Sequence, residues 1–463
     1  MPKQHWIAAV CICTALSCTG TPSSTPWEDT AEKPNPSAPP TDTLPQFYDR
    51  VPSNLLFLSI DTFRRDHMRR YGHPNDVVPF LDDLAENGFS LDDHTQCSNW
   101  TFHSTTCTLM GRNPIEDGWA PRLGRVHRTP VPENTPLLAS YLGDAGFYSI
   151  LVSNNNWLSM NWGNAQGYDR FRVPPNSGAA STFSTGLDEL LTARDEGRAS
   201  RWFLHLHLLE PHAPYDPPDE YLEGIEALPP TTHDLANKDI QYELRDGWGS
   251  LEEEERAVIE QHLRFRYEAE MKWMDEQIRL MFADLGARGL LDDTLVVVWT
   301  DHGEQFWEHG RHTHAYALYP EENDALAFFW ATNIVPGAWT GPTTAIDLVP
   351  TLLGLYGIDR PDEVTGIPLG EAAEDRARVA FTLARSGPIQ SVRKGSHRLQ
   401  YRWSGGVEVY DRATDPTEQN NLYDINDATT LDLWNELLPW IGVADAAVEE
   451  RSVTWPSGLP RPK

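Results

Sequence analysis

Two short runs of apolar residues restrict the fold of this chain more than any other feature. They are LLFLSI at residues 55–60 and LVVVWT at residues 295–300, and an aspartate directly follows each run, Asp61 and Asp301. A continuous apolar stretch of this length is typical of a strand buried on both faces, as in the centre of a parallel sheet. The two runs therefore predict two central strands that each end at a carboxylate.

Helical and strand patterns alternate through the rest of the main domain. We expect an amphipathic helix over 135–147, strands at 148–153 and 201–208, a long charged helix over 250–288 and another helix over 346–357. Strands that alternate with helices predict a doubly wound α/β fold with a mostly parallel sheet.

The pattern changes near residue 385. Short strands are expected at 391–403 and 406–411, followed by a terminal helix near 427–442. This predicts a small C-terminal antiparallel-sheet subdomain. We therefore divide the folded chain into a main domain at 51–384 and a subdomain at 385–463.

The N-terminal 50 residues have the pattern of an export signal and a tether. Residues 1–18 combine Lys3 with an apolar run of 12 residues, which is too short to span a bilayer, and end in ALSC at Cys18. This ending resembles the lipobox of bacterial lipoproteins, although cleavage without lipid is the alternative. Residues 19–50 are rich in Pro, Ser and Thr and predict a disordered tether. We expect a periplasmic or cell-surface protein, anchored to a bacterial membrane through lipidated Cys18.

The charge of the chain argues against one class of partner. The 463 residues include 68 Asp and Glu but only 37 Lys and Arg, so the net charge is −31. Because such a surface repels polyanions, we expect no nucleic-acid partner.

The acidic ends of the two buried runs indicate a metal site. Ligands of doubly wound sheets bind beyond the carboxyl ends of the strands, where Asp61, Asp301 and the adjacent His302 are expected. A buried carboxylate needs compensation by a cation or by backbone donors, and an Asp-His pair can reach one cation from a single turn. Taken alone, Asp61 is also compatible with a helix cap or a turn, and an Asp-His pair is a weak signal.

Several blocks of sequence resemble the sulfatase family of the alkaline-phosphatase superfamily. They include NLLFLSIDTFRRDHMRRYG, LLASYLGDAGF, HLLEPHAPYDPP, LLDDTLVVVWTDHGE, IDLVPTLLGLYGI and VYDRATDPTEQNNL, and they run in the family's order from residue 54 to the 420s. The resemblance implies an alkaline-phosphatase-like fold, a sulfatase-like catalytic domain at 51–384, and hydrolysis of a sulfate or phosphate ester.

The resemblance also implies a role for six residues. Asp61, Asp301 and His302 match metal ligands, and Thr101 matches the metal-bound nucleophile because it lies ten residues before Gly111. His212, in PHAP, and His314, before Leu318 and Tyr319, match residues that face the transferred group, with His212 expected to take part in catalysis. The expected cofactor is one divalent cation, Mn²⁺, Ca²⁺, Mg²⁺ or Zn²⁺.

The chain departs from the family pattern at four places. Type I sulfatases carry C-x-P-S-R, whose Cys or Ser becomes formylglycine, whereas here the segment is Thr101 to Thr105. Threonine cannot form that aldehyde, so no formylglycine is expected, and Thr105 replaces the arginine. Thr62 replaces a second metal aspartate, and SNNNWLS at 153–159 occupies the region of the family's G-K-x-H segment.

These departures favour phosphoryl transfer over sulfate hydrolysis. A threonine ester cannot expel sulfate by elimination as an aldehyde hydrate does, so it must be attacked again at the central atom. A Thr with Asp and His ligands also resembles the Thr-nucleophile phosphotransferases of the superfamily, such as lipoteichoic acid synthases. The alternative is a catalytically silent, sulfatase-like exported lipoprotein that binds a glycan or a partner.

Two cysteines flank the expected nucleophile. Cys97 and Cys107 could form a disulfide in an oxidising compartment. Because a bridge between residues ten apart needs a specific geometry, we expect two buried free thiols instead.

Overall fold

The two apolar runs form neighbouring parallel strands in the centre of a large sheet. In the computed structural model, which describes residues 44–116, 130–176, 178–382, 387–446 and 456–460, β1 is Asn54–Ile60 and β6 is Thr294–Thr300. Every residue of both strands is buried, and Ile60 pairs with Thr300 at their carboxyl ends. The pairing therefore brings the two following aspartates to the same edge of the sheet.

The large sheet has eight strands in the order β10-β2-β9-β6-β1-β5-β3-β4. The pairs of β1 with β5 and β6, of β3 with β4 and β5, and of β2 with β10 are parallel, while β9 is antiparallel to β2 and β6. The remaining strands are β2 (Phe89–Thr95), β3 (Tyr148–Ser153), β4 (Arg170–Arg172), β5 (Trp202–Leu208), β9 (Ala327–Trp330) and β10 (Gly337–Thr344).

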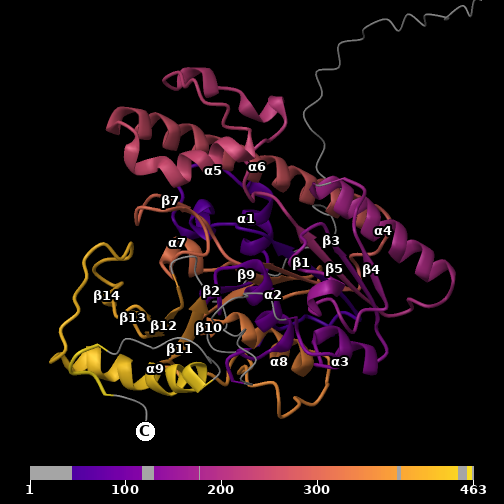
Figure 1. Cartoon of the computed structure of the whole chain (residues 1–463). Coiled ribbons are helices and arrows are strands. Elements are labelled where there is room, and N and C mark those ends of the chain that lie inside the picture. The colour runs from indigo at the N-terminus through magenta and orange to yellow at the C-terminus, as the bar shows by residue number, and fades with distance from the viewer. Residues whose placement is uncertain (1–43, 117–129, 177, 383–386, 447–455, 461–463) are drawn as a thin grey trace, which may run out of the picture. The chain divides into compact units, whose positions relative to one another are not determined.

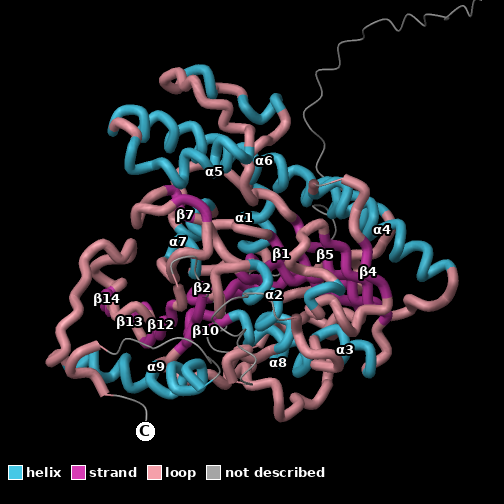
Figure 2. The backbone as a smooth tube through the Cα atoms, viewed as in Figure 1, coloured by secondary structure: helices cyan, strands magenta, loops and turns pink. Residues whose placement is uncertain are grey.

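Helices cover both faces of this sheet (Figures 1 and 2). Leu56, Leu58 and Ile60 pack in one core with α1 (Pro79–Glu86), α4 (Ala179–Asp195) and α6 (Glu253–Ala287). Leu55 and Phe57 point to the opposite core, which contains residues of α2 (Thr101–Met110), α3 (Leu138–Asp144) and α8 (Leu348–Leu355). Alternation of side chains along a strand explains why both faces of β1 are apolar. The expected doubly wound α/β fold is confirmed.

A separate antiparallel sheet forms the C-terminal part of the chain, as expected. Its strands, in order, are β11 (Arg378–Thr382), β12 (Ile389–Lys394), β13 (His397–Arg402) and β14 (Val407–Asp411). Helix α9 (Ala428–Ala446) packs against it through Trp434, Leu437 and Ile441. The first strand of this sheet precedes residue 385, where the sequence pattern changes.

Two short strands and two short helices lie outside the two large sheets and the helices named above. They are β7 (Gln305–Phe306), β8 (His312–Thr313), α5 (Lys238–Gly247) and α7 (Pro320–Asn323). In the parts of the chain that the structure describes, no helix has the length and apolar character needed to cross a membrane. The predicted signal at 1–18, with Cys18, and residues 19–43 of the predicted tether lie outside the described residues.

Candidate active site

The site lies at the edge where β1 and β6 end. Asp61 follows β1, and its backbone N–H donates to Leu208 O (3.0 Å) at the end of β5. Asp301 follows β6, and its backbone N–H donates to Ile60 O (3.2 Å). The sheet hydrogen bonds thus continue for one residue beyond each strand and hold both carboxylates in register. Asp61, Asp301 and His302 are all fully buried.

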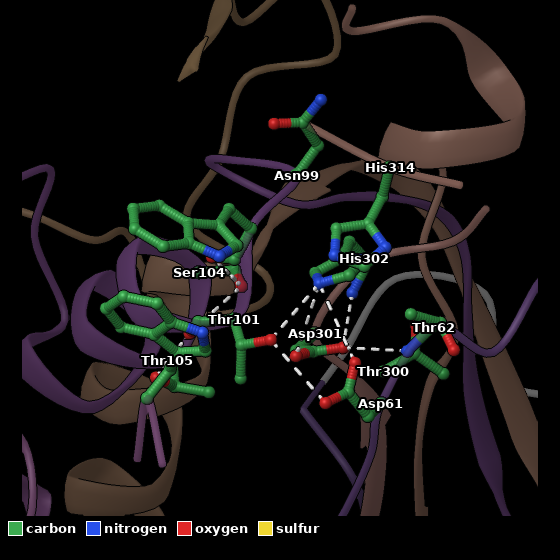
Figure 3. Close-up of polar contacts among 12 residues, drawn as sticks. Asp61, Thr62, Asn99, Thr101, Ser104, Thr105, Thr300, Asp301, His302 and His314 are labelled. Atoms are coloured by element: carbon green, nitrogen blue, oxygen red, sulfur yellow. Dashed lines mark hydrogen bonds and ion pairs between the residues drawn. The ribbon is translucent and has the colours of Figure 1, made fainter. Parts of the chain in front are cut away.

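The four residues expected around the metal do meet (Figure 3). His302 Nε2 lies 3.7 Å from Asp61 Oδ1, 3.6 Å from Asp301 Oδ2 and 3.4 Å from Thr101 Oγ1. Thr101 Oγ1 lies 3.5 Å from Asp61 Oδ2. Two ligands of one tetrahedral cation, each about 2.1 Å from it, are about 3.4 Å apart. The spacing therefore fits a shared ion better than direct hydrogen bonds, which are shorter.

His207 is a fifth member of the group that the sequence did not identify. It lies on β5, and its Nε2 is 3.5 Å from Asp61 Oδ2. One ligand atom each from Asp61, His207 and Asp301 lie within 4.8 Å of one another. The only signal in the sequence was the alternation of two histidines in WFLHLHL, which places both on the same face of a buried strand.

A row of buried hydrogen bonds holds the His207 ring. Its Nδ1 lies 2.8 Å from Ser59 Oγ, which is also 2.9 Å from Nε2 of His205. The Nδ1 of His205 in turn lies 2.8 Å from the Tyr168 hydroxyl. Partners of this kind on the far ring nitrogen are common for metal-binding histidines, because they fix the ring orientation.

The polar atoms that face the centre of the site have unmet hydrogen-bonding capacity. Among the described residues, Asp61 Oδ1, Asp301 Oδ2 and His207 Nε2 are buried without a hydrogen-bond partner. Buried polar atoms are seldom left without partners, and unpaired charges are costly. A divalent cation would satisfy all three, so the residues present fit the metal that the site requires.

The pKa values in the site reflect two carboxylates placed together in a buried space. Burial and the charge of Asp61 raise the pKa of Asp301 well above its ordinary value. Burial alone would also raise the pKa of Asp61, but the positive charge of His212 and the nearby imidazole of His207 lower it. Burial lowers the pKa of His302, which favours the neutral form that can bind a metal. Like charges this close cannot both persist without a cation.

The backbone just after Asp61 is strained. Thr62 has φ 54°, a left-handed conformation that is unfavourable for a β-branched residue. Its N–H donates to Asp301 Oδ1 (3.1 Å), and its carbonyl accepts from the Tyr267 hydroxyl (2.7 Å). Thr62 thus replaces the second aspartate of the family pattern with a backbone contact that orients Asp301.

Thr101 is the first residue of α2, and its side chain points to the carboxylates (Figure 3). Thr105, in the position of the family's arginine, donates its hydroxyl back to Thr101 O (2.6 Å) and accepts from Asn164 Nδ2 (3.3 Å). Thr105 therefore contributes no charge to the site.

Asn155 is a second residue that the sequence did not single out. It belongs to the SNNNWLS segment after β3, and its Nδ2 donates to Asp61 Oδ2 (2.5 Å) and lies 3.4 Å from Thr101 Oγ1. Its Oδ1 accepts from the backbone N–H of Trp157 (2.8 Å), which fixes the direction of the amide. A neutral amide thus occupies the region where the family has a lysine and a histidine.

His212 and His314 lie side by side, with ring centroids 5.1 Å apart, and the centroid of the His314 ring lies 4.4 Å from that of His302. His314 Nδ1 lies 2.8 Å from Glu304 Oε1, and Glu304 also accepts from the Tyr215 hydroxyl (2.6 Å). His212 donates from Nδ1 to Ala213 O (2.6 Å). Burial opposes protonation of His212, but the charges of Asp61 and Glu304 raise its pKa overall.

These residues line a cavity of about 490 Å³ that includes Thr101, Asn155, His212 and His314. Its other lining side chains include Trp100, Trp157 and Tyr242, and Lys238 is the one lysine or arginine among the described residues that line it. The cavity therefore combines an aromatic wall with a cationic side chain, next to the carboxylates.

The expectation of two free thiols beside the nucleophile is wrong. The structure joins Cys97 and Cys107 in a disulfide, with their Cα atoms 6.8 Å apart. Residues 101–110 form a helix, and the turn before it brings Cys97 back toward Cys107. This Cα separation lies within the range that a disulfide spans, so the geometric objection does not hold.

Comparison with known proteins agrees with this geometry. The family model described as Sulfatase matches residues 53–358, which is most of the main domain. The chain belongs to the sulfatase family. Members of this family are metal-dependent, in agreement with the cluster of Asp61, His207 and Asp301.

The relatives of this sulfatase-family chain are distant. Choline-sulfatase from Rhizobium meliloti (strain 1021) is 25% identical over 253 residues, 51% of this chain and 49% of the relative. The chain thus spans about half the length of this relative. Phosphonate monoester hydrolase from Silicibacter pomeroyi superposes with a TM-score of 0.65 at 21% identity, over 86% of this chain and 96% of the other.

A higher structural similarity is found with BT4656 in complex with its substrate D-glucosamine-2-N,6-O-disulfate. The TM-score is 0.70 at 16% identity, over 86% of this chain and 100% of the other. At these identities the structural matches establish the fold.

Proposed function

We propose that this protein is a metal-dependent hydrolase or transferase of phosphate or sulfate esters, with Thr101 as the nucleophile and phosphoryl transfer favoured. The observation that carries the proposal is the position of Thr101 Oγ1, 3.5 Å from Asp61 and 3.4 Å from His302, at the wall of the cavity. A hydroxyl at that position is beside the site for the cation and open to a substrate.

Asp61, Asp301, His302 and His207 would hold the cation together with Thr101. A bound divalent cation would lower the pKa of the Thr101 hydroxyl and offset negative charge on the ester. Two imidazole nitrogens among these ligands favour Zn²⁺ or Mn²⁺ over Ca²⁺ and Mg²⁺, which prefer oxygen ligands.

Two groups of the chain's own residues would divide the reaction between them. Asn155 and the N-terminal end of α2 keep the Thr101 oxygen directed toward the substrate. That oxygen forms a bond to phosphorus as the ester oxygen departs on the opposite side. His212, whose raised pKa favours the protonated form, would stabilise the equatorial oxygens or give a proton to the departing alkoxide, together with His314.

Phosphoryl chemistry is favoured because the covalent product must be opened by a second attack. The phosphothreonine formed at Thr101 would be attacked at phosphorus by water, or by an acceptor alcohol in a transferase. Formylglycine cannot form at Thr101, so the elimination route of type I sulfatases is not open to this chain. Export and lipid anchoring through Cys18 remain our proposal for its location.

The test uses the full chain, stripped of metal and reloaded with Mn²⁺, Zn²⁺, Mg²⁺ or Ca²⁺ singly. Aryl phosphate monoesters, diesters, phosphonates and sulfates are then compared as substrates. We expect turnover of a phosphorus ester with Mn²⁺ or Zn²⁺, and a loss of about 10³-fold or more in Thr101→Ala. Mass spectrometry of a quenched reaction should detect phosphate on Thr101.

Ser104→Ala is the matched control. Ser104 lies one turn further along the same helix, but its hydroxyl donates to Trp100 O (3.0 Å), so its loss should change activity little. Sulfate-ester turnover that depends on Thr101 would overturn the phosphoryl preference. If the wild type is no faster than Thr101→Ala with any metal or substrate, the alternative of a catalytically silent lipoprotein would be favoured. That alternative is the second candidate because the uncharged Thr105 stands where the family has an arginine.

A further inference from the structure

A second group of metal-binding side chains lies apart from the candidate active site. It consists of His67, in the 3₁₀ turn Arg65–His67 after β1, His73 in the following loop, and Glu268 on α6. One ligand atom from each of these residues lies within 4.8 Å of the others. His67 is buried, while the side chains of His73 and Glu268 are 14% and 27% exposed. The group is therefore partly buried yet open to solvent on one side.

The distance between the side chains of His73 and Glu268 is longer than that of an ordinary hydrogen bond. His73 Nε2 lies 3.8 Å from Glu268 Oε1, which is too long for a hydrogen bond. Ligand atoms on one tetrahedral cation are about 3.4 Å apart, so a small side-chain movement would let both contact one ion. The distances at the first site, 3.4 to 3.7 Å, are similar.

The two histidine rings are held in a way that suits metal binding. The Nδ1 of His67 lies 3.1 Å from Asp66 Oδ1, and Arg64 in turn holds Asp66 through two contacts (2.7 and 3.0 Å). The Nδ1 of His73 lies 3.1 Å from Asn75 O and, less closely, 3.4 Å from Asn75 N. In each ring an oxygen thus holds Nδ1 and leaves Nε2 for a cation, as in many zinc sites.

The rings are also fixed relative to each other and to α6. His67 and His73 stack with centroids 5.1 Å apart and an interplanar angle of 17°. His67 packs edge-on against Tyr267, the residue that precedes Glu268, with centroids 5.2 Å apart. Both the loop after β1 and the helix therefore present their ligands from ordered positions.

We infer that His67, His73 and Glu268 form a second metal site, which binds Zn²⁺ or a similar transition-metal ion with water completing the coordination. Two imidazoles and one carboxylate select this class over Ca²⁺ and Mg²⁺. The ion would tie α6 to the loop after β1, since its ligands come from both. It would add to the hydrogen bonds of Tyr267, which donates to Thr62 O (2.7 Å) and accepts from Arg64 N–H (2.9 Å). Its role is therefore to brace the segment that begins with Asp61.

The decisive experiment counts zinc ions. The full chain, untagged and stripped with a chelator, is titrated with Zn²⁺ by calorimetry, alongside Asp61→Asn/Asp301→Asn and His73→Gln/Glu268→Gln. We expect two equivalents in the wild type and one in each double variant. His73→Gln alone should weaken the second binding event by at least about tenfold. An unchanged stoichiometry and affinity in His73→Gln/Glu268→Gln would overturn the second site, whatever the active-site variant shows.

His233→Gln is the matched control. His233 Nε2 lies 3.0 Å from the carboxylate of Glu255, which is on α6 like Glu268, and a single His-Glu pair should bind no ion. The apo proteins are compared by circular dichroism to show that they fold. In a thermal melt, Zn²⁺ should raise the Tm of Asp61→Asn/Asp301→Asn. Zn²⁺ should not raise the Tm of the quadruple variant, which also carries His73→Gln and Glu268→Gln. An equal rise in the Tm of the double and the quadruple variant would contradict the proposal.

Discussion

The two candidate cation sites use similar side chains but are built in different ways. At the first, Asp61, His207 and Asp301 come from three adjacent strands, and all are fully buried. At the second, His67 and His73 come from one loop and Glu268 from a helix, and two of the three are partly exposed. The first site therefore depends on the pairing of the sheet, whereas the second depends on a helix docking against a loop.

This difference predicts different roles for an ion at each site. Asp61 and Asp301 are two buried carboxylates with oxygen atoms within 4.8 Å of each other, and such a pair needs a positive charge nearby. The first site should therefore strongly favour the state with a cation bound. The second site has one carboxylate and open access to water, so its ligands can remain solvated when no ion is bound. Arg64 connects the two sites. It pairs with Asp66, which holds His67 of the second site. It also donates to the backbone carbonyl of Glu304, and the side chain of Glu304 holds His314.

The largest expected effect is at the first site. Asp301→Asn keeps the shape of the side chain but removes a charge that the cation requires, so we expect kcat/KM on a phosphorus ester to fall by about 10³-fold or more. Asp293→Asn is the control, because Asp293 lies at the opposite end of the same strand pair and accepts from Ser53 N–H (2.9 Å). Equal losses in both variants would mean that stability rather than the site is responsible.

A smaller effect is expected from the row of side chains behind the first site. His207→Gln should weaken metal binding by about 10- to 100-fold, and Ser59→Ala by less, because Ser59 only orients the ring. Metal affinity is measured by competition with a chromophoric chelator. The control variant is His94→Gln, which changes a buried histidine that lies on β2 and outside the site, so its metal affinity should not change. Metal affinity unchanged in His207→Gln would remove His207 from the ligand set.

The ion pairs between the sites should produce a pH effect on stability. Burial would raise the pKa of Glu308, but Arg64 and Arg264 lower it to about 2. A lowered carboxylate pKa stabilises the fold at pH values above the ordinary value of 4.5, and this contribution is lost as the pH falls from 4.5 toward 2. We expect up to about 3 kcal/mol from this group at neutral pH.

Chemical denaturation at several pH values would check this. Between pH 5 and pH 3, the free energy of unfolding should fall less steeply in Glu308→Gln than in the wild type. Glu254→Gln, an exposed change on α6, should leave the slope as it is. Parallel curves for all three proteins would show that Glu308 does not contribute in this way.

The sequence predicted the parts of the fold and of the site that depend on local pattern. The runs before Asp61 and Asp301 identified central strands, because burial on both faces leaves an uninterrupted apolar stretch. The order of the strands was not readable, and it is this order that places β5 beside β1 and so brings His207 to the metal. Asn155 was missed for a similar reason, since its position depends on how the segment after β3 turns toward the site.

The resemblance to a family brought together residues that pattern alone could not. Thr101, His212 and His314 are far apart in the sequence, and each would be unremarkable in isolation, yet all three line one cavity. The disulfide was predicted wrongly because nine intervening residues say little about distance when six of them lie in a helix.

The row from Tyr168 through His205 and Ser59 to His207 has a directional property. Ser59 carries one hydroxyl hydrogen, so it can donate to His205 Nε2 or to His207 Nδ1, but not to both at once. A cation on His207 Nε2 would leave the proton on its Nδ1. Ser59 would then donate to His205 Nε2 (2.9 Å), which is closer than Leu206 O (3.4 Å), and the proton of His205 would lie on the nitrogen that faces Tyr168. Metal occupancy would thereby set the tautomer of His205, a residue outside the proposed ligand set, and ¹⁵N chemical shifts of that ring would report it.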